Sequence, residues 1–84
     1  MFYVYILKSL KDCQLYIGYT KNLQRRFNEH NNGKSLATKN RIPLTLVYYE
    51  AYLAEIDAKN REKFFKTGWG RNYIKRNLKK SLLI

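Results

Sequence analysis

The amino-acid sequence predicts a small α+β domain, in which a three-stranded antiparallel sheet is flanked by helices in the order β-β-α-β-α-α. Strand-like runs rich in β-branched and aromatic residues lie at 2–8, 14–19 and 44–52. Apolar residues at helical spacing follow at about 23–30, 57–66 and 71–82. A chain of 84 residues has room for one modest core, so we expect a single domain over 1–84.

The first two strands are expected to form a hairpin, because a polar turn at 11–12 separates them. Side chains alternate between the two faces of a strand, which places Tyr5 and Leu7 on the same face. In the second strand Tyr16 shares a face with Gly18. Because Gly18 has no side chain, we expect a partner or a substrate backbone to approach the sheet closely there.

A first helix is predicted over about 23–30, and it ends at an Asn-Asn-Gly signal. Leu23 and Phe27 lie four residues apart and form the apolar contact by which this helix docks. Arg26 and His30 are also four apart, and they are expected along the edge of that contact.

A polar and basic loop follows at 33–41. Its cations Lys34, Lys39 and Arg41 are candidate contacts for a phosphate backbone, although a solvated connector has the same composition. The third strand, at 44–52, begins after Pro43 and is rich in Leu, Val, Thr and Tyr.

The second helix is expected to begin near Asp57, which resembles a capping residue, and to end near Lys66. Gly68-Trp69-Gly70 is interpreted as a tight connector around a large aromatic ring. A third helix is expected from about Arg71, and its buried stripe consists of Ile74, Leu78 and Leu82.

The charge balance points to a polyanionic partner. The chain has 17 Lys and Arg residues against 6 Asp and Glu, a formal net charge of +11. Nucleic acid is the usual counterpart of so basic a domain, although a soluble basic protein without an anion site has the same balance. No apolar run reaches the roughly 18 residues that a membrane-spanning helix needs, so no membrane partner is expected. The single cysteine, Cys13, fits a reducing cytoplasm.

Glu62 is the acidic residue with the most informative position, because the spacing of Ala58 and Phe65 places it on the inward face of its helix. An ionised carboxylate near a core is costly unless it is paired or holds a cation. One reading is an ion pair with Arg61, Arg26 or a nearby lysine. The other is a ligand for Mg²⁺, which keeps several waters and takes few protein oxygens.

The remaining candidates each have an ordinary structural interpretation. Most arginines on helices are solvated, most lone histidines are structural, and Tyr5 and Tyr16 suit a core or a sheet edge. The position of Arg26 beside the docking contact nevertheless makes it a candidate phosphate clamp. Composition and spacing therefore indicate a basic nucleic-acid-binding protein, and by themselves they do not indicate an enzyme.

The order of these residues resembles the GIY-YIG nuclease superfamily over essentially the whole chain. Tyr3-Val4-Tyr5 stands where the family has Gly-Ile-Tyr, and Tyr16-Ile17-Gly18 matches the second triplet. Arg26 follows ten residues after Tyr16, and Glu62 matches the metal-binding glutamate. Small standalone bacterial proteins, often described as excinuclease-subunit-C-like, are the most similar branch. They end in a segment like Gly68-Trp69-Gly70-Arg71. The glycine of the first triplet varies among them, and here Tyr3 occupies that position.

This resemblance implies a metal-dependent endonuclease that hydrolyses phosphodiester bonds in DNA, in repair or recombination, in the bacterial cytosol or nucleoid. Glu62 is expected to hold Mg²⁺, for which Mn²⁺ substitutes, and Arg26 to neutralise charge on the phosphoryl group. Tyr5 is favoured as the general base and Tyr16 as a positioning hydroxyl, with His30 as a base or proton relay. Contacts with nucleic acid are expected from six residues: Gly18, Lys34, Lys39, Arg41, Arg61 and Arg71.

Little intrinsic sequence specificity is expected, because relatives that cut defined targets carry additional recognition regions. No small-molecule cofactor is expected. The alternative is a non-catalytic nucleic-acid-binding module of the same fold. A less favoured reading is an interaction protein that docks through Trp69 to a larger repair or ribosomal assembly. Pairing of two copies to cut both strands is a further expectation that the sequence leaves open.

Overall fold

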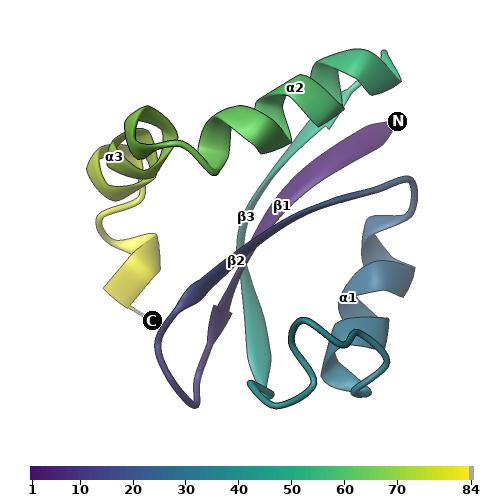
Figure 1. The fold of residues 1–84 in the computed structure, drawn as a ribbon, viewed down its shortest axis with the longest axis vertical. Helices are drawn as coiled ribbons and strands as arrows, with labels where there is room; N and C mark the ends of the chain where they lie inside the picture. The colour runs from purple at the N-terminus through teal and green to yellow at the C-terminus, as the bar shows by residue number, and fades with distance from the viewer. Residues whose placement is uncertain (84) are drawn as a thin grey trace.

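The structure is a computed structural model that describes residues 1–83, and it confirms the predicted α+β architecture (Figure 1). The elements follow the predicted order β-β-α-β-α-α, and a short 3₁₀ helix, η1, comes last. Their bounds are β1 Phe2–Ser9, β2 Leu15–Thr20, α1 Leu23–Asn31, β3 Leu44–Tyr52, α2 Glu55–Phe65, α3 Gly68–Asn77 and η1 Ser81–Leu83.

The sheet is antiparallel, and β1 is its central strand, in the order β2-β1-β3. A central strand covered on both faces should be apolar throughout, and Val4, Tyr5, Ile6 and Leu7 are all 2% exposed or less. The hairpin register pairs Tyr5 with Gly18. This register places an aromatic ring of the central strand directly beside the residue without a side chain.

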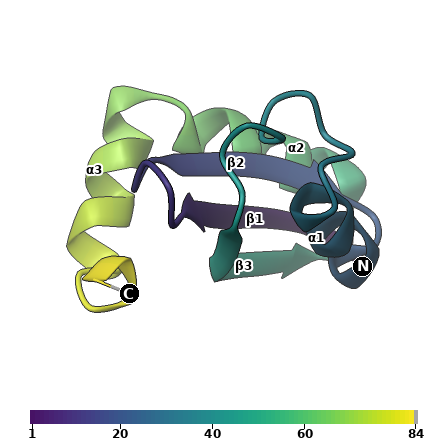
Figure 2. The same cartoon turned by 90° about the horizontal axis from the view of Figure 1, so that it is seen from below.

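Each face of the sheet carries its own helices (Figure 2). On one face Val4 and Ile6 pack with Ala58 and Phe65 of α2 and with Ile74 of α3. On the other face Tyr5 and Leu7 pack with Leu44, and Leu23 and Phe27 of α1 close over them. The alternation predicted for β1 is therefore confirmed, and the molecule has one core on each side of a single sheet.

Helix α1 has the predicted start and docking contact. The side chain of Asn22 accepts a hydrogen bond from the backbone N–H of Arg25 at 3.0 Å, which caps the first turn. The helix ends at Asn31, and Gly33 follows with φ of 74°, a conformation that glycine adopts without strain. No helix within residues 1–83 is long and apolar enough to cross a membrane.

The second helix begins earlier than expected. It starts at Glu55 after Ala54, so Asp57 lies in the first turn and is not the cap. Acidic residues in a first turn interact favourably with the helix dipole, which explains why Asp57 resembled a start signal.

The interpretation of Gly68-Trp69-Gly70 as a connector was wrong, because these residues form the first turn of α3. Thr67 is the N-cap, and its hydroxyl accepts a hydrogen bond from the backbone N–H of Gly70 at 3.1 Å. A β-carbon at Gly70 would lie 2.0 Å from the carbonyl oxygen of Phe64. The glycine is therefore needed for the close approach of α3 to the end of α2.

The predicted apolar stripe of the third helix extends past its end. Ile74 is buried within α3, whereas Leu78 is the C-cap and Leu82 lies in η1. Both leucines still pack against the core of the α2 face.

The two glycines of α3 provide a matched test of this packing. Gly70→Ala should lower the free energy of unfolding by about 1–3 kcal/mol, because the new methyl group meets backbone atoms that cannot move aside. Gly68→Ala is the control. Its β-carbon meets nothing within 4 Å, so it should be neutral or stabilising by about 0.4–1 kcal/mol. Urea unfolding followed by circular dichroism measures both, and equal effects of the two substitutions would contradict the close approach.

Candidate active site

The ring of Tyr5 lies across Gly18, which is its cross-strand partner. A β-carbon at Gly18 would lie 2.3 Å from the Tyr5 hydroxyl and 2.4 Å from the ring carbon that bears it. The space beside Gly18 is thus filled by a side chain of the same domain. This corrects the expectation that a substrate backbone approaches there, and Gly18 is not available as a nucleic-acid contact.

Tyr5 and His30 form a buried polar pair. The Tyr5 hydroxyl lies 2.8 Å from Nε2 of His30, and Nδ1 of His30 lies 2.7 Å from the hydroxyl of Thr38. Both His30 and Thr38 are 0% exposed. Burial, and then the nearby charge of Arg26, lower the pKa of His30, so the ring is neutral near pH 7. A neutral imidazole donates one of these hydrogen bonds and accepts the other.

Thr38 was not among the predicted site residues. It belongs to the 33–41 loop, which the sequence indicated only as basic and solvated. The side chains of Ser35 and Thr38 are buried, so the loop folds back against His30 instead of extending into solvent. No spacing rule connects a threonine in a loop to a histidine eight residues earlier, and only the folded loop brings them together.

Burial raises the pKa of Tyr5 to about 12, although Arg26 beside the hydroxyl partly opposes this. A tyrosine that serves as a general base at neutral pH would need a pKa below its ordinary value of about 10. At Tyr5 the cost of placing a phenolate in the core outweighs the attraction of the arginine. Tyr5 is therefore firmly protonated at neutral pH.

Arg26 and Tyr16 line the open side of this pair. The guanidinium of Arg26 is about a third exposed and is held at 3.1 Å by Glu29, one turn along α1. Tyr16 is partly exposed, and its ring centroid lies 5.1 Å from that of His30 and 6.4 Å from that of Tyr5. Solvent and ligands can thus reach the Tyr16 and Arg26 side chains, whereas Tyr5 and His30 lie behind them.

Glu62 approaches this cluster from α2, on the other face of the sheet. Its side chain is 23% exposed and forms a salt bridge with Lys66 at 3.2 Å. This is the ion pair with a nearby lysine that the sequence left open as one reading of Glu62. The charge of Glu62 contributes to the raised pKa of Tyr5, so the carboxylate lies within electrostatic range of that hydroxyl. The two faces meet at β2 because it is an edge strand.

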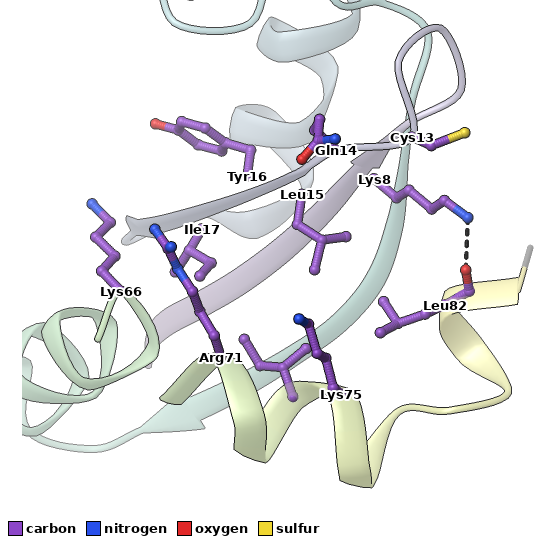
Figure 3. Close-up of a pocket in the computed structure, with 11 residues that line it drawn as sticks. Lys8, Cys13, Gln14, Leu15, Tyr16, Ile17, Lys66, Arg71, Lys75 and Leu82 are labelled. Atoms are coloured by element: carbon purple, nitrogen blue, oxygen red, sulfur yellow. Dashed lines mark hydrogen bonds between the residues drawn. The ribbon is translucent and has the colours of Figure 1, made fainter. Parts of the chain in front are cut away.

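The predicted nucleic-acid contacts differ in availability. Lys34 and Lys39 are exposed in the loop. Arg41 instead pairs with Asp12 at 3.0 Å and ties the loop to the β1–β2 turn. Arg71 lines a pocket of about 720 Å³ between the hairpin and α3 (Figure 3).

Arg61 is held by contacts within the domain, and these contacts do not support the expectation that it binds nucleic acid. Its guanidinium binds Glu50 at 2.9 Å and lies 4.5 Å from the ring centroid of Phe65. Glu50 also accepts hydrogen bonds from Tyr48 and Tyr52. Burial acts to raise the pKa of Glu50, but these donors hold it below its usual range. Arg61 therefore belongs to a satisfied ionic network over the α2 core.

Comparisons with known proteins agree with the geometry. A family model described as the GIY-YIG catalytic domain matches residues 1–77. A UPF0213 protein of Clostridium perfringens is 46% identical over 67 residues, which are 79% of this chain and 71% of the relative. A UPF0213 protein of Staphylococcus haemolyticus is 47% identical over 66 residues, 77% of this chain and 79% of the relative.

A solved structure is similar as well. The solution NMR structure of the UPF0213 protein BH0048 from Bacillus halodurans has a TM-score of 0.57 and 34% sequence identity, covering 96% of this chain and 87% of that one. The resemblance inferred from the two triplets is confirmed by these matches. The chain described here belongs to the GIY-YIG catalytic domain family.

Proposed function

We propose that this protein is a divalent-metal-dependent endonuclease that hydrolyses phosphodiester bonds in DNA with little intrinsic sequence specificity. The observation that carries the proposal is that Tyr16, Arg26 and Glu62 all interact electrostatically with Tyr5, in a domain of the GIY-YIG family. Two further parts of the proposal follow from a DNA substrate. The protein would act in the bacterial cytosol or nucleoid, and its role would lie in repair or recombination.

The donor set at Glu62 fits a divalent cation. Among residues 1–83 no group of three or more His, Cys, Asp and Glu side chains gathers as a metal site, so Glu62 has at most one such side chain beside it as a further ligand. Mg²⁺ is commonly bound by one or two carboxylates together with waters and substrate phosphate oxygens, and Mn²⁺ accepts the same ligands. The lysine on Glu62 is half-exposed, so a cation can displace it. When bound, the ion would stabilise negative charge on the phosphoryl oxygens.

Arg26 would bind the scissile phosphate. A guanidinium offers paired donors that match two phosphate oxygens, and its charge offsets the charge that develops during attack by water. Glu29 holds the guanidinium in place and leaves part of it exposed. The attacking water adds to phosphorus and releases a proton to solvent, one P–O bond breaks, and the leaving oxygen takes a proton from solvent, so that the protons balance.

The roles of the two tyrosines are exchanged relative to the sequence-based hypothesis. A buried phenol with a pKa of about 12 is a poor general base at neutral pH, which argues against Tyr5. Tyr16 is accessible and lies beside the neutral imidazole of His30. We therefore assign contact with the attacking water to Tyr16, and Tyr5 acts as a positioning residue that orients His30.

The first prediction concerns Glu62 and Arg26. Glu62→Gln should abolish metal-dependent cleavage, and Arg26→Ala should lower the rate constant by about 10²–10³-fold, as expected when a group that stabilises transition-state charge is lost. The measurement is cleavage of branched, nicked, single-stranded and duplex DNA with Mg²⁺ or Mn²⁺.

The matched control is Glu55→Gln, which neutralises a carboxylate on the same helix that pairs with Lys59. It should leave cleavage unchanged. Equal activity of wild type and both site variants, or no cleavage of any substrate by the wild type, would contradict the proposal and favour a non-catalytic nucleic-acid-binding module.

The second prediction separates the tyrosines. Tyr16→Phe should reduce cleavage with little change in stability, since Tyr16 is partly exposed. Tyr5→Phe leaves a buried ring nitrogen of His30 without its partner and should cost about 1–3 kcal/mol of folding free energy. Cleavage rates and urea unfolding on both variants test this, and a larger stability loss in Tyr16→Phe would reverse the assignment.

The third prediction is a pH dependence. The folded state holds the pKa of His30 below its ordinary value, whereas in the unfolded chain a histidine titrates near about 6.5. The unfolded state therefore binds the proton more readily, and stability is full above about pH 6.5 and declines as the pH falls below it.

The wild-type Tm should thus decrease as the pH is lowered from about 6.5 to about 5, an interval above the range in which carboxylates titrate. His30→Gln has no titrating ring, and its Tm should stay nearly constant over the same interval. A parallel decline of both proteins would show that His30 is not the group responsible.

A further inference from the structure

A groove lies beside the cluster of proposed catalytic residues and shares Tyr16 with it. It occupies about 720 Å³ between the β1–β2 hairpin and α3, and its floor includes Leu15, Ile17 and Ile74 (Figure 3). One end is closed by η1, where the ammonium of Lys8 donates to the carbonyl oxygen of Leu82 at 2.6 Å. We refer to this space as the basic groove, because the charged side chains among its lining residues are all cationic.

Two cations of the basic groove have no partner within residues 1–83. Arg71 and Lys75 lie four apart on α3, so they project from the same side of the helix. Both are exposed, and neither side chain has a hydrogen bond or ion pair there, in contrast to Arg41 and Arg61. Holding several like charges together without a carboxylate is unfavourable in the free protein, and an anion relieves the repulsion.

The basic groove is continuous with the candidate active site. Tyr16 contributes to its lining, and so does Lys66, which pairs with Glu62 at 3.2 Å. In Figure 3 Lys66 and Arg71 extend from the helical side toward β2, on which Tyr16 lies. A chain of phosphates that passes Tyr16 and Glu62 would therefore reach the basic groove as its next contact.

We propose that the basic groove binds the phosphate backbone of a single-stranded segment that flanks the scissile phosphate, an inference that rests on the proposed function. Its volume is in the range that holds a drug-sized ligand, which corresponds to about one or two nucleotides and is too small for a duplex. The lysine and arginine side chains of the basic groove bind phosphate regardless of sequence.

The test is binding of a single-stranded DNA oligonucleotide in EDTA, where no metal-dependent cleavage occurs, at several salt concentrations. Arg71→Gln/Lys75→Gln is compared with Lys79→Gln/Lys80→Gln, which removes the same charge outside the basic groove. Each phosphate contact on a single strand adds about 0.7 to the slope of log affinity against log salt. The groove variant, Arg71→Gln/Lys75→Gln, should show a slope smaller by about 1.4 and a weaker affinity. The control variant should keep the slope and the affinity of the wild type.

Equal losses in the two double variants would overturn the proposal, because the attraction would then be a property of net charge alone. A duplex oligonucleotide is the second arm. A loss for duplex as large as for the single strand would overturn the single-strand assignment. Circular dichroism checks that each variant is folded.

The only cysteine gives an independent readout. Cys13 is exposed and lines the basic groove, so a bound strand should cover it. Saturating single-stranded DNA should slow maleimide alkylation of Cys13 in the wild type, and the groove variant should lose this protection at the same DNA concentration. Unchanged alkylation in the DNA-saturated wild type would contradict occupancy of the groove.

This experiment and the test of the proposed function fail separately. Binding in EDTA is independent of catalysis, so a wild type that cleaves nothing leaves the groove assignment testable. Conversely, a wild type that cleaves DNA while the two double variants lose equal affinity would support the proposed function and overturn only the groove assignment.

Discussion

The buried hydrogen bond between Tyr5 and His30 determines the arrangement of the candidate active site. It joins the central strand to helix α1 across 25 residues of sequence, in a region where both side chains are almost fully buried. A buried polar group without a partner is costly, so the hydroxyl and the imidazole confine each other to one geometry. Thr38 satisfies the second ring nitrogen, and Gly18 leaves the room that the Tyr5 ring occupies.

The position of β2 at the sheet edge is what would let residues from both faces act together in the proposed active site. Helix α1 brings Arg26 and His30 to one face, and α2 brings Glu62 to the other. Across a central strand the sheet would keep these groups apart. At an edge strand the two faces meet at the side, and Tyr16 of β2 lies at this junction beside His30. A small domain thereby assembles a mixed set of charged and hydrogen-bonding groups without opening its core.

The positive charge of the chain is divided between structural and available cations. Arg61 is stacked on aromatic rings and paired with Glu50, and Arg41 ties two loops together. These arginines contribute to the net charge of +11, but each is already held by a carboxylate of the same domain. Within residues 1–83 Arg71 and Lys75 have no such ties, and they line a groove beside the candidate active site. Net charge alone therefore identifies a class of ligand, and the partners of each cation decide where that ligand is held.

The sequence by itself determined the element order, the two faces of β1, the docking of α1 through Leu23 and Phe27, and the family, because periodicity and motif spacing are local properties of the chain. It did not determine the first turn of α3, since a Gly-Trp-Gly segment reads as a turn until Thr67 caps it. Only the tertiary structure decided that Tyr5 is buried and protonated and that Gly18 is covered. It also decided that Arg61 is bound to Glu50. Burial, pKa and ion pairing depend on contacts between residues distant in the sequence, and no spacing within one element encodes them.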